Sequence, residues 1–346
     1  MNYSISVLFR AIPLFMALFC FAYGAFIFFT GDDANSKTAG PVLFFLGSIC
    51  IALFCTAATI IRQIIHTYDE KIKIVLPVAG YSAALITLIF GIIMIVAAPV
   101  YFVVGNVVSG LGLITACVST AATVSAKFAL IPENNRSGIT DVNTKAYGEK
   151  TEMFFKLLTG LFALVAWIWA FILLSGASAT PHFVAGTVMG GIACICTSLI
   201  ALVASIIRQE RNVYHEKDKQ QWPRLVLVMG SIALLWGMII LVYYYSNVRD
   251  FVGYVMVGLG LVCYSISSKV ILLAKVWRSD YPLAARIPLI PVLTALCALF
   301  LAAFLFQGAL LEAKYFVPAR VLAGLGAICF TLFSIVSILE SGTSKK

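Results

Sequence analysis

Charged residues are scarce in this sequence. Asp, Glu, Lys and Arg make up 11% of its 346 residues, against about 25% in a soluble globular protein. The chain also lacks a Walker loop, an HExxH helix, a Gly-x-Ser-x-Gly turn and Cys or His residues at metal-ligand spacing. Its nine cysteines fall inside apolar runs, where we expect them to pack rather than to pair. These absences predict that the protein is not an enzyme and holds no metal or cofactor.

Apolar residues, in contrast, make up 62% of the chain. They form ten runs of about twenty residues or more, long enough to cross roughly 30 Å of hydrocarbon. A net charge of +9 would suggest a nucleic-acid partner in a soluble chain. Here the basic residues lie at the ends of apolar runs, where they mark membrane topology instead. We expect an all-α, polytopic membrane protein whose partner is membrane lipid and not nucleic acid.

The even-numbered apolar runs align with one another without gaps. We count repeat positions from Lys37, Phe102, Phe183, Asp250 and Phe316, each taken as position zero. Positions three and ten are small in every run, and such a stripe lets helix backbones approach closely in lipid. The small residues at position three are Gly40, Gly105, Gly186, Gly253 and Ala319. Those at position ten are Gly47, Gly112, Ala193, Gly260 and Gly326.

A second stripe, at positions five and twelve, is β-branched in all five runs. Its members are Val42, Val107, Val188, Val255 and Val321 at position five, and Ile49, Ile114, Ile195, Val262 and Ile328 at position twelve. Two recurring faces predict that each even-numbered helix packs on two sides, so we place these helices inside and the more aromatic odd-numbered helices outside, facing lipid. The repeat predicts five parallel helical hairpins with a pseudo-fivefold arrangement in one transmembrane domain, 1–346. The expected hairpins are about 8–66, 73–130, 152–210, 222–278 and 286–341, with a cytoplasmic loop at 132–150.

The basic residues also predict the orientation. Only four of the 24 Lys and Arg residues, Lys37, Arg249, Lys314 and Arg320, fall on the side opposite the two termini. The positive-inside rule therefore predicts cytoplasmic N- and C-termini, with every hairpin in the same orientation.

Lys269 is the one formal charge well inside an apolar run. It lies six residues before the basic edge at Lys275, about 9 Å along a helix. One interpretation is that the side chain snorkels to water. The other is that it faces the interior beside Tyr264 and Ser268 and gates or binds an anionic group. We consider all three to be candidate cavity or gating residues.

Two further candidates lie near the opposite edge. His182 is either an ordinary cap residue or a pH sensor, because histidine titrates in the mildly acid range. Arg320 takes the place of uncharged residues in the other runs. We expect either an ion pair with Asp250 or Glu312, or a role in the cavity.

Several stretches resemble the YhiM-like inner-membrane proteins of enteric bacteria over the whole chain. They are "ACVSTAAT" at 116–123, "TPHFVAG" at 180–186, "CYSISSKV" at 263–270, "RIPLIPV" at 286–292 and "RVLAGLGAICFTLFSIVSILESGTSKK" at 320–346. This family is classed as a domain of unknown function, and the resemblance implies the bacterial inner membrane and a role in acid stress. This chain has Thr187 where the family tends to have His, so His182 is left as the main pH-sensing candidate.

With the role that the resemblance implies, these features predict an inner-membrane protein of the acid-stress response. We expect a central cavity or passage for a small solute, ion or lipid, as in a transporter or channel. The alternative is a non-transporting scaffold that acts on a partner or on the bilayer. The shortage of intramembrane acids argues against a proton-coupled pump, since proton relays use chains of Asp, Glu or His.

Overall fold

Ten long helices make up the fold in a computed structural model, which describes residues 3–64, 70–127, 149–210, 215–243, 251–276 and 286–343. Each helix contains a stretch long and apolar enough to cross a membrane. The helices are α1 (Tyr3–Thr30), α2 (Ala34–Ile64), α3 (Glu70–Ala97), α4 (Phe102–Lys127), α6 (Glu149–Ser175), α7 (Thr180–Glu210), α8 (Glu216–Tyr243), α9 (Phe251–Ile271), α10 (Leu289–Ala309) and α11 (Phe316–Thr343).

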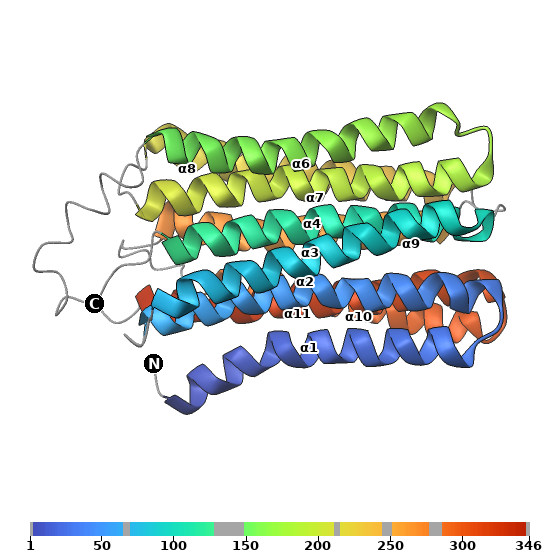
Figure 1. The fold of residues 1–346 in the computed structure, drawn as a ribbon, viewed down its shortest axis with the longest axis horizontal. Helices are drawn as coiled ribbons and strands as arrows, with labels where there is room; N and C mark the ends of the chain where they lie inside the picture. Colours follow the sequence, from blue (N-terminus) through green and yellow to red (C-terminus); the bar gives the residue numbers. More distant parts are fainter. Residues whose placement is uncertain are drawn as a thin grey trace, which may run out of the picture.

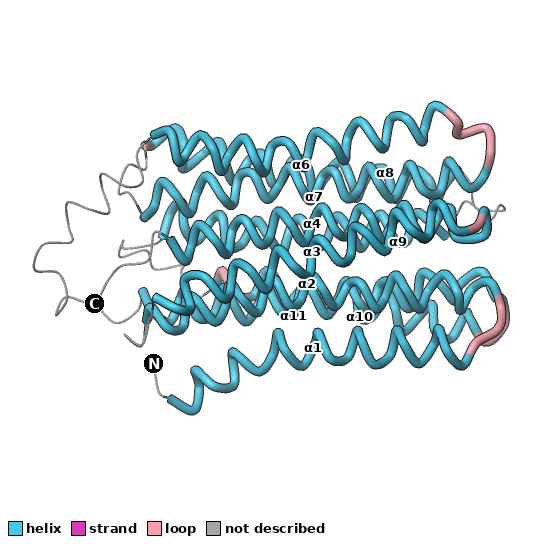
Figure 2. Tube along the Cα trace, in the orientation of Figure 1, coloured by secondary structure: helices cyan, strands magenta, loops and turns pink. Residues whose placement is uncertain are grey.

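The helices run side by side along one axis (Figure 1). The start of α1 and the end of α11 lie at the same end of the bundle, on the left, which we call the terminal end. Short connections join α1 to α2, α3 to α4 and α6 to α7 at the opposite end, which we call the turn end (Figure 2). Consecutive helices therefore pair as hairpins that open in the same direction.

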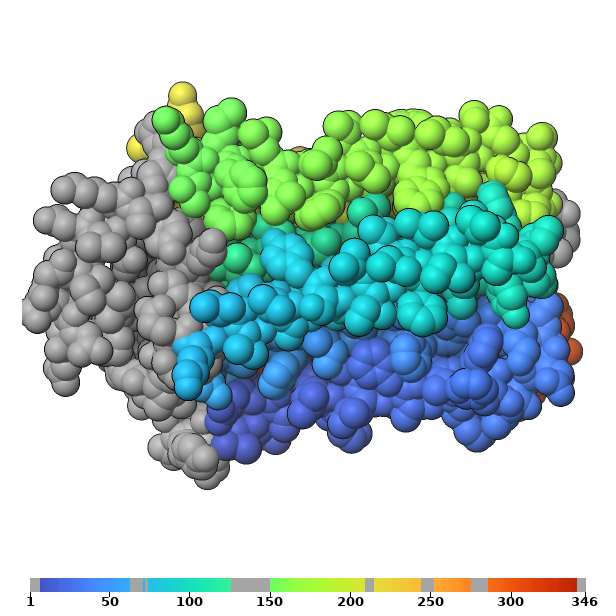
Figure 3. Space-filling view, in the orientation of Figure 1, coloured from blue at the N-terminus to red at the C-terminus, as the bar shows by residue number. Residues whose placement is uncertain are grey.

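The helices fall into two classes by burial. In α2, α4, α7, α9 and α11, between 78% and 89% of the most apolar window is buried, against 22% to 33% in α1, α3, α6, α8 and α10. Large exposed apolar side chains of the described residues all lie on the second set or on its connections. In the space-filling view, α3 crosses the middle of the visible face and α6 covers its upper part (Figure 3). The inner and outer assignment made from sequence agrees with this burial.

The five inner helices close into a ring. α2 contacts α4, α4 contacts α7, α7 contacts α9, α9 contacts α11, and α11 returns to α2. Each outer helix packs most extensively on the inner helix that follows it in the chain.

The stripe at positions three and ten holds each hairpin together. A Cβ on Gly40 would lie 2.9 Å from the carbonyl oxygen of Gly24 in α1, and one on Gly253 would lie 2.8 Å from that of Gly237 in α8. The other stripe glycines also face the outer helix of their own hairpin: Gly47, Gly105, Gly112, Gly186, Gly260 and Gly326. Backbones this close leave no room for a side chain, which is the packing expected of small stripes in a membrane.

A further glycine position, which our sequence analysis missed, joins neighbouring hairpins. It is position eight, and its glycines are Gly110, Gly191, Gly258 and Gly324. Each receives side chains from positions six and nine of the next inner helix. A Cβ on Gly258, for example, would lie 2.6 Å from Leu322 and 2.7 Å from Leu325. The first run has Phe45 at this position, where its ring packs near Phe90, so the same contact is repeated around the ring with one exception.

Candidate functional site

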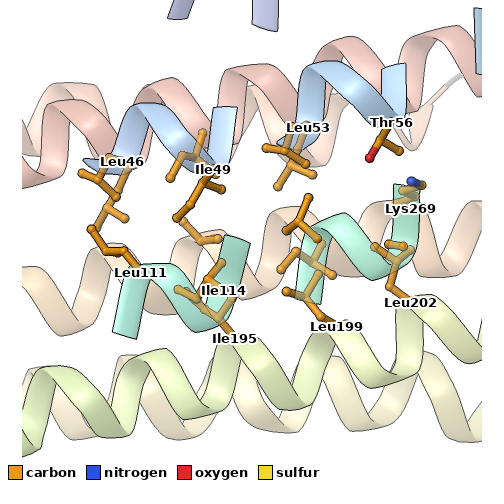
Figure 4. Close-up of a pocket in the computed structure, with 17 residues that line it drawn as sticks. Leu46, Ile49, Leu53, Thr56, Leu111, Ile114, Ile195, Leu199, Leu202 and Lys269 are labelled. Carbon is orange, nitrogen blue, oxygen red and sulfur yellow. The ribbon is translucent and has the colours of Figure 1, made fainter. Parts of the chain in front are cut away.

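A narrow cavity lies at the centre of the inner ring. Its lining comes from all five inner helices and from none of the outer ones. The lining residues are Leu46, Ile49, Leu53 and Thr56 of α2; Leu111, Ile114, Val118 and Ala121 of α4; Ile195, Leu199 and Leu202 of α7; Val262, Ile266 and Lys269 of α9; and Leu325, Ile328 and Leu332 of α11. Figure 4 shows side chains from several helices pointing into the space between them.

The lining follows the sequence alignment of the five inner runs. Every lining residue occupies position nine, twelve, sixteen or nineteen of its run. Of the β-branched stripe, all five residues at position twelve line the cavity and none of those at position five does. Corresponding positions of five different helices therefore face one axis.

The cavity is long and thin. Positions nine to nineteen span about 15 Å of helix, yet the space open to the centre of a water molecule is only about 20 Å³. That volume holds about one water. In this structure the axis is therefore nearly closed by side chains.

Lys269 supplies the one charge in the cavity. It lies at the same end of the lining as Thr56 and Leu202, with Leu46 and Leu111 at the other end (Figure 4). Its side chain is 2% exposed, and its Nζ has no hydrogen-bond partner. The snorkelling interpretation requires the ammonium to reach water. The Nζ of Lys269 is instead buried and faces the interior.

The other buried charges of the described residues are paired. Glu152 of α6 and Asp218 of α8 both contact Arg208 of α7, and Lys156 bonds Glu152 at 2.7 Å. A buried charge without a partner costs several kcal/mol. Among the buried charges of the described residues, only Lys269 lacks a counter-charge, so it differs from the structural charges Glu152 and Asp218.

The chain also changes geometry beside Lys269. After α9 ends at Ile271, residues Leu272–Val276 form a π-helical segment, η3. Such wide turns are rare and occur often at functional sites. The irregular turn begins three residues after the unpaired ammonium.

The neighbours of Lys269 in sequence do not accompany it into the cavity. Tyr264 shares a 2.7 Å hydrogen bond with Ser231 of α8. Ser268 donates to the carbonyl oxygen of Ser265 in its own helix at 2.5 Å. Neither residue lines the cavity, so of the three candidates the structure brings only Lys269 to the axis.

His182 lies at the turn end, in the first turn of α7, and faces the start of α4. Its ring lies against that of Phe102, tilted by 42° with centroids 4.7 Å apart, and its Nδ1 is buried without a partner. It lies outside the axial lining. A sensor at this position would act through the packing of α4 against α7.

Arg320 also lies at the turn end. Its guanidinium stacks 3.3 Å from the ring centre of Phe316 and 5.0 Å from that of Phe306, and its Nη1 donates to the Phe316 carbonyl at 3.0 Å. The partner expected from sequence, Glu312, instead pairs with Lys314 at 2.9 Å. Asp250 lies outside the described residues. Arg320 thus contacts aromatic rings and not Glu312, and it is not among the residues that line the cavity, while the pair with Asp250 stays a prediction.

Two expectations from sequence stay predictions: the cytoplasmic loop and the absence of a metal site. Nearly all of the expected cytoplasmic loop 132–150 lies outside the residues that the structure describes. Within the described ranges, no group of three or more His, Cys, Asp or Glu residues could hold a metal ion.

Comparison with known proteins gives two matches along the full chain. The family described as "Protein of unknown function (DUF2776)" matches residues 1–344. The "Inner membrane protein YhiM" of Escherichia coli (strain K12) is 44% identical over 350 residues, covering 100% of both chains.

Proposed function

Because the chain belongs to the YhiM-like family of unknown function, DUF2776, we propose that it is a non-enzymatic inner-membrane protein with a passage or binding cavity along its central axis. The observation that carries this proposal is the cavity lining. All five inner helices contribute positions twelve and sixteen to it, and one unpaired ammonium lies within it. The occupant would be a small solute, an ion or a lipid.

The same observation supports a repeat with pseudo-fivefold character. The ring of inner helices, the glycine contact repeated at position eight and the shared lining positions each relate one hairpin to the next. Parallel repeats about an axis near the membrane normal form one class of transporter architecture. In this proposal the axis of the repeat and the axis of the passage coincide.

We place the terminal end in the cytoplasm. The basic residues are concentrated there, as the positive-inside rule requires. Single cysteines at Asn35 and Lys219 should then react with a membrane-impermeant thiol reagent from opposite sides, with Asn35 facing the periplasm. The reverse labelling would overturn the orientation.

The acid-stress role that the resemblance implies supplies a test. Ile114→Trp and Leu199→Trp would fill the axis, whereas Leu85→Trp places the same bulk on α3 at an exposed, lipid-facing position. In a strain without its own copy of the protein, a working passage predicts that the two axial variants fold but fail to restore acid survival. The lipid-facing variant should restore survival fully.

The second candidate is a scaffold that transports nothing. The small volume of the cavity favours it, because about 20 Å³ passes no solute without movement of side chains. A scaffold predicts that both axial variants restore survival, which would contradict the passage.

A further inference from the structure

The axial cavity combines features that point to one class of ligand. It has a single unpaired ammonium at one end and an apolar lining along the rest of its length. We propose that it binds a single-chain monoanion with a slim apolar body, such as a medium-chain fatty acid, whose carboxylate pairs with Lys269. This inference rests on the proposed function and deepens it.

The lining favours a ligand with an apolar body over an inorganic anion. Of the 17 lining residues only Thr56 and Lys269 are polar. The hydroxyl of Thr56 donates to the carbonyl oxygen of Ala52 at 3.1 Å, so its proton is already used. A chloride or phosphate would give up its hydration for one donor, and unpaired buried charge is costly. A fatty acid has one charged group to satisfy, and its chain gains from leaving water.

The charge decides against a neutral or cationic ligand. Lys269 is fully enclosed, and no described carboxylate lies in the lining. A bound carboxylate would give Lys269 a counter-charge, as Arg208 does for Glu152 and Asp218 elsewhere in the bundle. A cation on the same axis would meet like charge in a medium of low dielectric.

The shape decides for one unbranched chain. The lining runs for about 15 Å along the axis and is narrow throughout, since about 20 Å³ is open to water-sized groups. Leucines supply seven of the lining side chains, at 46, 53, 111, 199, 202, 325 and 332. Binding of one chain would require these leucines to change rotamer, whereas a two-chain phospholipid would force the inner helices apart. The carboxylate then lies at the terminal end and the methyl group points toward the turn end.

The test measures binding of radiolabelled dodecanoate to the purified protein in nanodiscs of zwitterionic lipid. We expect saturable binding that unlabelled octanoate and dodecanoate displace. Dodecanol has no charge, dodecylamine has a positive charge, and acetate and phosphate have no long apolar chain. None of the four should compete. Adding phosphatidylglycerol to the disc should not reduce binding, because the proposed ligand is a single-chain acid and not a membrane phospholipid.

Two variants and one control locate the site. Lys269→Met keeps the length of the side chain and should weaken dodecanoate binding on the order of tenfold or more, because a charge-assisted contact is lost. Leu199→Trp keeps the charge, fills the seam and should also abolish binding. Lys219→Met removes an exposed lysine at the same end of the bundle and should bind as the wild type does. If Lys269→Met does not fold, the binding to Leu199→Trp and the competition measurements still test the proposed site.

Several results would overturn the inference. They are non-saturable uptake, equal binding by Lys269→Met, competition by acetate or phosphate as strong as by dodecanoate, and displacement by phosphatidylglycerol. In each case the passage would stand if axial tryptophans still abolished acid survival. Conversely, saturable dodecanoate binding together with normal acid survival of the axial variants would refute the passage but support the proposed ligand.

Discussion

Trp169 of α6 donates its indole N–H to the side-chain oxygen of Asn106 in α4 at 2.8 Å. The bond joins two different hairpins, and the amide of Asn106 in turn donates to the Phe102 carbonyl at 2.6 Å. A polar contact of this kind fixes the rotation of one helix against another, which apolar packing alone leaves less defined.

Replacing this tryptophan should loosen the junction. Trp169→Phe removes the donor and leaves the oxygen of Asn106 unpaired, which should cost about 1 kcal/mol of unfolding free energy. The midpoint of thermal unfolding in detergent measures the loss. Trp222→Phe is the matched control, because the Trp222 N–H is buried without a partner and its removal should cost no hydrogen bond. Equal midpoints for Trp169→Phe and the wild type would contradict the role of the bond.

The glycine stripes should be intolerant of even one methyl group. Gly253→Ala places a Cβ 2.7 Å from Leu241 and 2.8 Å from the Gly237 carbonyl oxygen, so α8 and α9 must separate. Overpacking of this kind costs about 1–3 kcal/mol. Gly160→Ala is the control, since nothing lies within 4 Å of its added Cβ, and it should be neutral or stabilising because alanine favours helix. Similar thermal midpoints for both variants would show that the stripe is not an interface.

The charge cluster at the terminal end should be sensitive to its one arginine. Arg208→Met would leave Glu152 and Asp218 buried without this counter-charge, although Lys156 still pairs with Glu152. We expect a loss of about 2 kcal/mol, below the value for a fully buried pair because Arg208 is partly exposed. Lys219→Gln breaks an exposed pair with Glu216 and should change the unfolding midpoint little. An unfolding midpoint for Arg208→Met no lower than that of Lys219→Gln would refute this role.

Asp33 should make the turn end sensitive to strong acid. The Ser36 hydroxyl donates to its carboxylate at 2.5 Å, and the backbone N–H groups of Asn35 and Ser36 donate at 3.2 and 3.3 Å. These bonds, the Ser36 hydroxyl first, lower the pKa of Asp33 below its ordinary value of 3.8.

The sign follows from the lowered pKa. The folded chain binds the proton of Asp33 more weakly than the unfolded chain does, so the stabilisation is complete above about pH 3.8 and is lost as pH falls through the folded pKa. Thermal unfolding of the wild type and of Asp33→Ala should therefore differ near neutral pH and converge at lower pH. A difference that stays constant across this range would rule out the carboxylate as its source.

Much of the fold could be predicted from sequence, because apolar run length and small-residue spacing are local signals. The ten spans, the inner and outer sets and the facing of Gly40 and Gly253 all follow from them. The β-branched stripe was predicted as a packing face, and only its five residues at position twelve line the cavity. The assignment of all five hairpins to one pseudo-symmetric repeat stays a prediction supported by these contacts.

The candidate site was harder to predict, for physical reasons. An inner helix is apolar on every side, so the sequence period does not distinguish the face toward the central axis from the face toward the outer helix. Lys269 could therefore have pointed toward the axis or toward the surface. The link of Tyr264 to Ser231 and the pairing of Arg208 with Asp218 depend on how helices rotate against one another. The glycines at position eight were visible in the alignment, and the same spacing argument could have found them.

The measurement that tests the account most directly is an experimental density map of the wild-type protein in a lipid nanodisc. The account predicts a slim, continuous density along the axis between the five inner helices, ending beside the Nζ of Lys269. Closed side-chain packing with no such density, or Lys269 turned outward between α8 and α9 toward lipid, would contradict it.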